Sequence, residues 1–415
     1  MANQPTVIYV GTRRGPQEAN RALMAARDAG YRVALLGSRA PGIQDDLIHD
    51  FEKTNLSDRA TALDAALRLA QRTGASGALA WTDGGVELAA ALSEKCGWRG
   101  VPVEAAHRAR NKHSMRAALA HRPDLIPRFA LVTSLEELLA AREEIGAPAV
   151  LKPAGGSGSR SILQVEPDTD LTALFAQATA LTLPSVASIF GDYPGQFVYE
   201  ERMGGTEHSV EGYVHDGRTY IAGITDKQVS FPYYVEYQEI HPSALPDTAV
   251  RAVHALTDEV TRAIGLDWCG FHLECRVLAD GTAKLLEIAA RPGGGFITSH
   301  LVPGSTGIPF HENLVRLTAG HTPDLEHRSR AYFGSRSIIS PVEGVFQGFA
   351  GLNEVLQVGG LEQFVFAHAI GDKIVLPPGD AGSCELGSAL VRAPLFQDVQ
   401  DALESAAALA RPIVE

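Results

Sequence analysis

The sequence predicts an α/β protein with a parallel α/β domain at its amino terminus and β-rich lobes after it. Up to about residue 105, apolar runs typical of strands alternate with helical stretches, which is the pattern of a parallel α/β unit. Further along, Asp-Gly pairs at 216–217 and 280–281 stand between apolar runs, and such pairs are the strongest short-range signal for a β-hairpin. At 415 residues the chain is too long for a single core, which predicts about three domains.

The amino-terminal segment, residues 1–105, supplies the elements of the predicted parallel domain in order. Strands are expected at 6–10, 31–36 and 77–81, and helices at 18–29, at 60–72 and after Asp83. The stretch Gly11-Thr-Arg-Arg-Gly15 follows the first strand, but it lacks the GxGxxG spacing of a dinucleotide site. We expect a plain turn between strand and helix there, with a place beside a substrate cleft as the alternative.

Composition and charge argue against several classes of function. The 36 basic and 49 acidic residues leave a net charge of −13, which disfavours a nucleic-acid partner and a polybasic membrane surface. The first residues form no charged segment followed by an apolar one, and no run of 18 apolar residues occurs, so a cytoplasmic protein is expected. The cysteines show no CxxC spacing and are expected to be reduced, packed thiols: Cys96, Cys269, Cys275 and Cys384.

The hairpin around Asp280-Gly281 carries a pair of carboxylates. If these two residues form a two-residue turn, Glu274 faces Glu287 across the strands, with Cβ atoms roughly 4.5–5.5 Å apart. Two carboxylates this close repel each other unless a cation lies between them. Their flanks are nearly continuously apolar, as in buried strands, so a cation site is favoured over a solvent-exposed pair. Oxygen ligands suit Mg2+, which completes its shell with water and phosphate oxygens; a nucleotide enzyme is predicted, with Mn2+ as an alternative ion.

Lysine is scarce in this chain, with seven lysines against 29 arginines, so each lysine marks a candidate place for a compact ammonium group. Lys112 lies on a helix expected from 105 to 120. Lys152 ends an apolar strand that runs into the Gly/Ser loop 155–161. Because glycine lets the backbone approach a ligand closely, this loop is predicted to hold a polyphosphate, while a flexible surface linker is the alternative.

A further strand is predicted from Phe197 on, and it ends in the adjacent acids Glu200 and Glu201. The hairpin with its turn at 216–217 follows, and a long helix is expected from 249 to 264. Acidic side chains are usually solvated, so the two acids by themselves do not indicate a ligand.

Taken in order along the chain, these motifs resemble the ATP-grasp superfamily: a lysine, a strand lysine with a Gly-rich loop, a Glu-Glu pair, and two metal carboxylates followed by an arginine. The resemblance covers most of the chain and implies an ATP-grasp domain at 106–325, whose two lobes divide near 185–195, and a β-rich carboxy-terminal lobe at 326–415. It also implies ATP and Mg2+ as ligands. The roles it assigns are phosphate contacts for Lys112, Lys152, Gly155, Gly156, Ser157, Gly158, Ser159 and Ser161, adenine contacts for Glu200, Glu201 and Met203, a ribose contact for Glu207, metal contacts for Glu274 and Glu287, and catalytic roles for Lys152 and Arg291.

Within the superfamily, the chain resembles the L-amino acid ligases, the dipeptide synthetases of the bacilysin-pathway type. The resemblance rests on Asp226-Lys227, on Glu239-Ile-His241-Pro242, and on the run Glu-Ile-Ala-Ala-Arg-Pro-Gly-Gly-Gly that ends at Gly295. It implies substrate contacts from Lys227, Glu239, His241 and Gly294. Ala289 departs from the pattern of many ATP-grasp enzymes, which have Asn at this position, and alanine cannot ligate a metal ion.

The function that the resemblance implies is an ATP-dependent carboxylate–amine ligase, which joins an amino acid or related carboxylate to an amine through an acyl phosphate and releases ADP and phosphate. The expected partners are ATP and the small-molecule carboxylate and amine, and the family makes a homodimer plausible. Two other functions stay open: an ATP-grasp enzyme with an acceptor such as bicarbonate or formate, and a nucleotide-binding protein without turnover. Near the site, His272 is expected to pack in the core and His241 to touch substrate.

Overall fold

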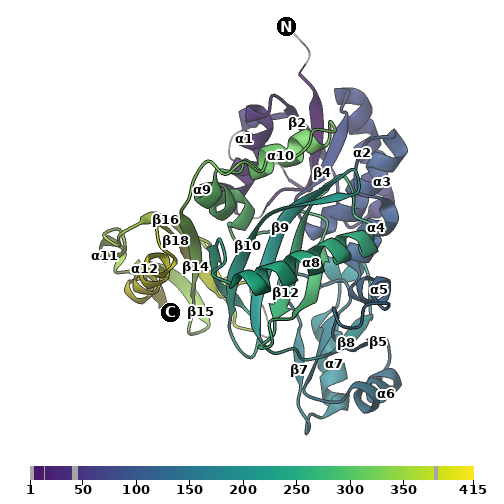
Figure 1. The fold of residues 1–415 in the computed structure, drawn as a ribbon, viewed down its shortest axis with the longest axis vertical. Coiled ribbons are helices and arrows are strands. Elements are labelled where there is room, and N and C mark those ends of the chain that lie inside the picture. Colours follow the sequence, from purple (N-terminus) through teal and green to yellow (C-terminus); the bar gives the residue numbers. More distant parts are fainter. Residues whose placement is uncertain (1–3, 14, 40–44, 378–381) are drawn as a thin grey trace.

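The computed structural model describes residues 4–13, 15–39, 45–377 and 382–415. Within these residues the strands form four sheets: a parallel sheet near the amino terminus, a small antiparallel sheet, a large antiparallel sheet and a short three-stranded one. Figure 1 shows the purple amino-terminal part at the top, the teal and green large sheet in the centre and the yellow carboxy-terminal lobe at the left. The predicted α/β class with β-rich lobes is confirmed.

The amino-terminal sheet is parallel, with the strand order β3-β2-β1-β4. Its elements are β1 (Thr6–Val10), α1 (Pro16–Asp28), β2 (Arg32–Gly37), β3 (Ile48–Lys53), α2 (Arg59–Thr73), β4 (Gly77–Ala80) and α3 (Val86–Cys96). The helices α2 and α3 cover one face of β1 and β2, and α1 covers the other, which explains why both strands are almost continuously apolar. The edge strand β3 is not predicted by the sequence pattern, because its only apolar residues, Ile48 and Phe51, lie three positions apart and give no strand alternation.

The strand order creates a crevice at one edge of this sheet. Because β1 lies between β2 and β4, the connections that follow β1 and β4 lead away from each other. In open α/β sheets, ligands bind at such a switch point, outside the carboxyl ends of the strands. The turns after β1 and β4 are therefore positioned to form part of a site.

The helix expected from 105 to 120 is two helices, α4 (Val103–Arg110) and α5 (Lys112–Ala118). The break falls at Asn111, whose backbone is extended, with φ −107° and ψ 112°. Its side-chain oxygen accepts a hydrogen bond from the backbone N–H of Ser114 at 3.0 Å, as an N-cap residue does. The second helix therefore begins at Lys112, whose backbone N–H donates to the carbonyl of Ala154 next to the Gly/Ser loop.

The small sheet is antiparallel and has the order β5-β8-β6-β7. It contains β5 (Phe129–Val132), β6 (Ala149–Pro153), β7 (Leu163–Val165) and β8 (Phe197–Glu201), and the helices α6 (Leu135–Ile145) and α7 (Leu171–Leu181) pack against it. The Gly/Ser loop connects β6 to β7, so it begins directly beyond Lys152 and Pro153.

The large sheet has the order β13-β12-β9-β10-β11-β14-β18-β16, and all of its strand pairs are antiparallel. Its strands are β9 (Thr206–His215), β10 (Arg218–Val229), β11 (Glu236–His241), β12 (Cys269–Val277), β13 (Ala283–Ala289), β14 (Tyr332–Ile339), β16 (Leu361–Phe366) and β18 (Glu385–Ala393). The helix α8 (Asp247–Ile264) covers one face of β9, β10 and β12 (Figure 1). Its buried residues Val253, Leu256, Val260 and Ile264 recur at the spacing of an amphipathic helix.

The β12–β13 hairpin pairs Glu274 with Glu287, as predicted, although the turn differs from the prediction. The turn has three residues instead of two, because the N–H of Leu278 donates to the carbonyl of Thr282 at 2.8 Å. Gly281, with φ 82°, takes the left-handed conformation that such a turn needs. The pairs next to the turn are thus one residue out of the predicted register, and a register shift directly after Glu274, as at a β-bulge, restores it.

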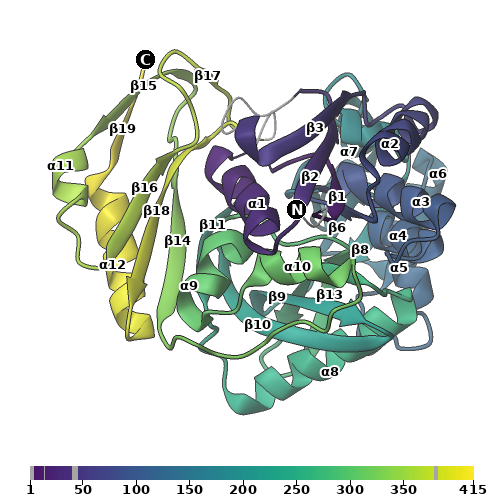
Figure 2. The ribbon, with the colours of Figure 1, turned by 90° about the horizontal axis from the view of Figure 1, so that it is seen from above.

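The carboxy-terminal segment continues the large sheet, because β14 pairs with β11. The proposed division into 1–105, 106–325 and 326–415 therefore crosses one sheet, between α10 (Phe310–Leu317) and β14. The helix α12 (Phe396–Leu409) lies against β14 and β18 (Figure 2) and is an addition to the predicted β-rich lobe. A second sheet there, β17-β15-β19, consists of β15 (Gly344–Ala350), β17 (Lys373–Ile374) and β19 (Arg411–Val414).

Shorter helical segments complete the described chain. They are the turns Asp45–Leu47, Asp83–Gly85 and Ser188–Gly191, a π-helical turn at Ile297–Leu301, and the helices α9 (Val302–Thr306) and α11 (Leu352–Val355). None of the helices in the described ranges has both the length and the apolar character that crossing a bilayer requires.

Candidate active site

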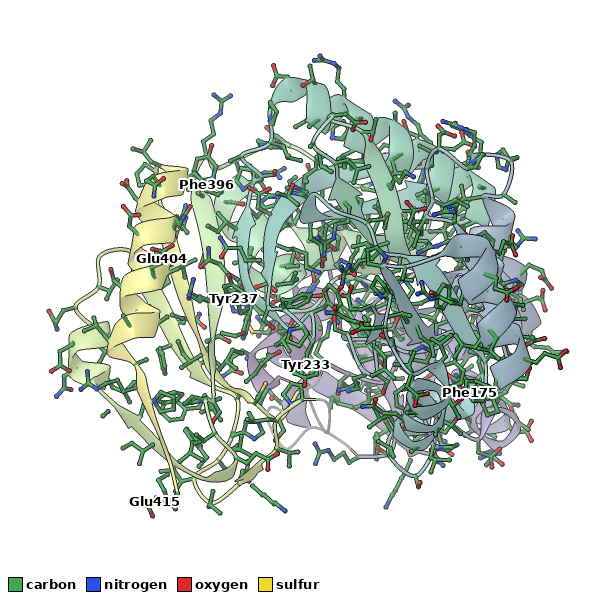
Figure 3. All side chains as sticks on the ribbon, turned by 90° about the horizontal axis from the view of Figure 1, so that it is seen from below. Phe175, Tyr233, Tyr237, Phe396, Glu404 and Glu415 are labelled. Atoms are coloured by element: carbon green, nitrogen blue, oxygen red, sulfur yellow. The ribbon has the colours of Figure 1, made fainter. Side chains whose placement is uncertain are left out.

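A cavity of about 860 Å³ lies where the amino-terminal, small and large sheets meet. Its wall is built from the turns after β1 and β4, the Gly/Ser loop, the end of β8 and the β12–β13 hairpin. In Figure 3, Tyr233, from the connection between β10 and β11, lies between Phe175 of α7 on the right and Glu404 of α12 on the left. The volume lies in the range of about 300–1,000 Å³ that is usual for small-molecule sites.

Glu274 and Glu287 each form an ion pair with a lysine. Oε1 of Glu274 lies 2.6 Å from Nζ of Lys227, and Oε2 of Glu287 lies 2.9 Å from Nζ of Lys112. The two ammonium groups offset the repulsion between the carboxylates, so the pair does not require a metal ion for this purpose. No hydrogen bond from the described residues reaches Oε2 of Glu274 or Oε1 of Glu287, which leaves one oxygen of each acid available to a ligand.

His272 is buried, as expected, but it lies between two carboxylates at the cavity wall. Its Nδ1 is 2.5 Å from Oε1 of Glu211, and its Nε2 is 3.1 Å from Oε1 of Glu274. Although burial lowers it, the pKa of His272 is raised to about 9 by Glu211 and Glu274, so the ring is positively charged at neutral pH. Glu211 also accepts a hydrogen bond from the backbone N–H of Gly293. His272 and Glu211 thus connect Glu274 to the glycine run after β13.

Lys227 is buried behind the cavity, among three carboxylates. Its Nζ lies 2.6 Å from Glu274, 2.8 Å from Glu236 and 3.8 Å from Glu207. One oxygen from each of these acids lies within 4.8 Å of the others, an arrangement that could hold a metal ion. Burial and the charges of Glu274 and Glu236 raise the pKa of Glu207 to about 7, although Lys227 opposes this shift. Lys227 therefore orients the acids of this wall from inside the protein.

Lys152 reaches the cavity from the end of β6. Its Nζ lies 2.6 Å from Oε2 of Glu200, and Arg116 donates to Oε1 of the same carboxylate at 3.0 Å. Burial lowers the pKa of Lys152, and Glu200 opposes this shift. Because the carboxylate of Glu200 is itself buried and bonded from both sides, it fixes the position of the lysine ammonium in the cavity wall.

The Gly/Ser loop contributes part of its length to the cavity. Gly156, Ser157, Gly158 and Ser159 line the cavity, whereas Gly155 and Ser161 do not. Gly155 packs on Tyr193, since a Cβ atom at this position would lie 2.5 Å from the tyrosine ring. Nζ of Lys112 donates to the carbonyl of Gly156 at 2.7 Å. Lys112 therefore holds the start of the loop and Glu287 at the same time.

Arg291 lines the cavity from just beyond the end of β13, which finishes at Ala289. Asp83, in the turn after β4, holds the side chain, with Oδ2 2.8 Å from Nη2 of Arg291. Arg110 lies 3.7 Å from the same carboxylate. Although burial raises it, the pKa of Asp83 is held well below its usual value by Arg291 and Arg110. The amino-terminal domain thus supplies the counter-ion of Arg291.

Comparison with known proteins bears directly on this cavity. Residues 145–300 match the family model of the ATP-grasp domain. This segment is an ATP-grasp domain. The crystal structure of an L-amino acid ligase from Bacillus licheniformis has the same fold as this chain, with a TM-score of 0.83, 20% identity and coverage of 100% of both chains.

Two groups of curated ligases are similar to part of this chain. Alanine–anticapsin ligase of Bacillus subtilis is 31% identical over 218 residues, which are 48% of this chain and 45% of that ligase. D-Alanine–D-alanine ligase of Cupriavidus metallidurans is 27% identical over 209 residues, which are 48% of this chain and 60% of that ligase. The chain thus spans about half the length of the curated relatives it matches.

The residues that the ATP-grasp resemblance assigns to adenine and ribose all line the cavity: Glu200, Glu201, Met203 and Glu207. Of the four predicted substrate contacts, Gly294 lines it, but Lys227, Glu239 and His241 do not. Glu239 is buried and accepts a hydrogen bond from Ser335 at 2.7 Å. His241 is fully buried, lies 2.6 Å from the hydroxyl of Ser305, and has a pKa lowered by burial to about 4. Glu239 and His241 are therefore buried behind the cavity wall, and their predicted contact with substrate stays a prediction.

The site residues that sequence reasoning missed come mainly from the amino-terminal part of the chain. Arg13 and Asp83 line the cavity and directly follow the two parallel strands that flank the switch point. Polar residues at the carboxyl ends of these strands were the available signal. Glu236 and Arg276 also line the cavity, on β11 and β12, but no local motif distinguishes them from ordinary strand residues.

Proposed function

We propose that this ATP-grasp protein is an ATP-dependent ligase that joins an amino acid or related carboxylate to an amine, itself an amino acid. The observation that carries the proposal is that Lys112, Lys152, Arg291 and the paired acids Glu274 and Glu287 line a single cavity. The names of the curated relatives, alanine–anticapsin ligase and D-alanine–D-alanine ligase, support the same class of reaction.

ATP is proposed to bind with its adenine at the end of β8, beside the backbone of residues 200–203, and with its ribose at Glu207. Its phosphates would then extend toward Lys112, Lys152 and the Gly/Ser loop, because these groups supply the cations and the exposed backbone N–H groups of the cavity. The loop has a second proposed task, which is to exclude the water that would hydrolyse a reactive intermediate.

Mg2+ is proposed to be held by Glu274 and Glu287. The donor set fits, since both acids offer hard carboxylate oxygens, and each keeps an oxygen that no hydrogen bond from the described chain reaches. A bound Mg2+ supplies neutralisation of charge on phosphate oxygens. His272 and Lys227 fix Glu274, and Lys112 fixes Glu287, so the chain prepares both ligands in advance.

In the proposed reaction, an oxygen of the substrate carboxylate attacks the γ-phosphorus of ATP, the bond to the β–γ bridging oxygen breaks, and ADP leaves. The amine then attacks the carbonyl carbon of the acyl phosphate, a C–N bond forms, the amine loses a proton, and phosphate leaves with the C–O bond electrons. Lys152 and Arg291 offset negative charge on the transferred group. Arg291 can contact two of its oxygens at once, so the chain acts mainly by positioning and charge neutralisation.

The test is turnover with ATP, Mg2+ and a panel of amino acids offered in pairs. We expect release of ADP and phosphate that depends on both a carboxylate and an amine, together with the corresponding amide in the mass spectrum. ADP release that requires bicarbonate or formate, without any amine, would instead indicate a different acceptor. Release of AMP and pyrophosphate would contradict the acyl-phosphate route, and ATP binding without turnover of any pair would indicate a nucleotide-binding protein.

A further inference from the structure

Arg13 reaches into the cavity from the switch point of the amino-terminal sheet. It lies in the turn after β1, is only 9% exposed and lines the cavity. Its Nη2 donates to the carbonyls of Pro292 and Gly293, the latter at 2.6 Å. The guanidinium therefore bridges the amino-terminal domain and the glycine run that follows β13, directly beside the proposed reaction centre.

Arg13 differs from Lys112, Lys152 and Arg291 because no carboxylate of the described residues forms an ion pair with it. Lys112, Lys152 and Arg291 form ion pairs with Glu287, Glu200 and Asp83. Within the described residues, no carboxylate lies within 4.0 Å of Arg13, and its Nε is buried without a hydrogen-bond partner. Burial lowers the pKa of Arg13 to about 10, so it is still charged at neutral pH. A buried charge without an anion is costly, and a ligand anion would remove this cost.

The space beside this guanidinium is kept open by a glycine. A Cβ atom at Gly294 would lie 3.6 Å from Nη1 of Arg13, and Gly294 itself lines the cavity. Nη1 makes no hydrogen bond within the described protein. Because residue 294 has no side chain, a ligand in the cavity can approach the free N–H groups of Arg13.

A complementary acid lies nearby in the same wall. Glu18, in the first turn of α1, lines the cavity, and its Oε1 is buried without a hydrogen-bond partner. Its negative charge acts on Arg13, where it opposes the lowering of the pKa by burial. One wall of the cavity thus presents an unpaired guanidinium and a carboxylate with an unsatisfied oxygen, which together match the two charges of a zwitterion.

We infer that Arg13 and Glu18 form a subsite for the amine substrate, in which Arg13 binds a free α-carboxylate and Glu18 holds the ammonium group before attack. This subsite would explain why the acceptor is an α-amino acid, as proposed above, and not a simple amine. This inference rests on the proposed ligase function, because the donor loses its carboxylate in the reaction and only the acceptor keeps one. Arginine is suited to this role, since its planar fork binds carboxylates with two parallel hydrogen bonds.

The test compares each aliphatic L-amino acid with its α-carboxamide as acceptor, at a fixed donor. The carboxamide keeps the nucleophilic amine but has no carboxylate, so it can act only as acceptor. We expect wild-type kcat/KM to be on the order of 100-fold lower for the carboxamide, the size of effect typical of a lost charge-assisted hydrogen bond pair. Arg13→Met should lower kcat/KM for the amino acid by a similar factor and leave the value for the carboxamide nearly unchanged.

Two further variants complete the design. Arg21→Met removes an exposed cation from α1, the helix that carries Glu18. It should leave kcat/KM for both acceptors unchanged. Gly294→Ala keeps Arg13 and its bonds to the carbonyls of Pro292 and Gly293 but places a methyl group 3.6 Å from Nη1. It should lower kcat/KM for the amino acid more than kcat/KM for the carboxamide. If Arg13→Met does not fold, Gly294→Ala still tests the proposed subsite.

Equal use of both acceptors by the wild type, or equal losses for both acceptors in Arg13→Met and Gly294→Ala, would overturn the subsite. If no pair of amino acids is joined, the ligase proposal fails, and calorimetric titration of the same amino acids and carboxamides into protein with ADP and Mg2+ then tests the subsite alone. Carboxylate-dependent binding that Arg13→Met abolishes and Arg21→Met retains supports it. Absent binding, or binding indifferent to the carboxylate, contradicts it.

Discussion

Replacing Glu287 with alanine is expected to lower kcat by about three orders of magnitude, because a metal ligand contributes several kcal/mol of charge stabilisation and each 1.4 kcal/mol is about tenfold. The variant removes one of the two acids proposed to hold Mg2+. It also leaves Lys112 without the carboxylate that lies 2.9 Å from its Nζ, so within the described residues this ammonium group keeps only its hydrogen bond to the carbonyl of Gly156 at the start of the Gly/Ser loop. Steady-state ADP release at saturating Mg2+ measures the loss.

The control for this variant is Glu94→Ala, which removes an exposed acid of α3, far from the cavity lining. It should turn over like the wild type, and the thermal unfolding midpoint of both variants should stay close to the wild-type value. If Glu287→Ala keeps near-normal activity at saturating Mg2+, the paired acids are structural and the metal site lies elsewhere.

Arg291→Ala is expected to lower kcat by roughly two to three orders of magnitude, as for other preorganised charge donors, with little change in ATP affinity. The reason is that the guanidinium is proposed to contact the phosphoryl group mainly as charge redistributes in the transition state. Removing such a group lowers kcat and kcat/KM together. Calorimetric titration with a non-hydrolysable ATP analogue, together with steady-state rates, separates the two effects.

Asp83→Asn provides a graded companion to this variant. It keeps the shape of the side chain but removes the charge that lies 2.8 Å from Arg291, so a smaller loss of kcat of the same kind is expected. Arg122→Ala, which breaks a surface ion pair with Asp124, is the matched control and should be silent. A large loss of nucleotide affinity with kcat preserved in Arg291→Ala would assign this arginine to ATP binding instead of the chemical step.

The elements that the sequence predicted well are those in which apolar residues form a continuous run or recur at regular spacing. The apolar strands β1 and β2 and the helix α8 have such repeats, and the structure contains them. The hairpin shows a limit: the pairing of Glu274 with Glu287 depends on a three-residue turn and a register shift that offset each other. Likewise the break at Asn111 depends on a single side-chain hydrogen bond, which helical periodicity cannot reveal.

The candidate site was predicted best where residue type alone carries chemistry. Scarce lysine marked Lys112, Lys152 and Lys227, and all three are buried at or behind the cavity. The carboxylate partners of His272 were not predicted, although His272 stands two residues before Glu274, and alternate residues of a strand share a face. The pairing of Arg291 with Asp83, 208 positions earlier, has no local signal, because it arises only when the amino-terminal sheet docks on the large sheet.

The most direct measurement of the central claim follows an oxygen atom from the donor carboxylate. If the enzyme activates the carboxylate by phosphoryl transfer, a donor labelled with 18O in both carboxylate oxygens should yield phosphate that contains one 18O atom for each amide formed, while the amide carbonyl keeps the other. Mass spectrometry of phosphate and amide from the same reaction detects both. Amide formation with unlabelled phosphate, or with the label in AMP, would contradict an acyl phosphate in this cavity.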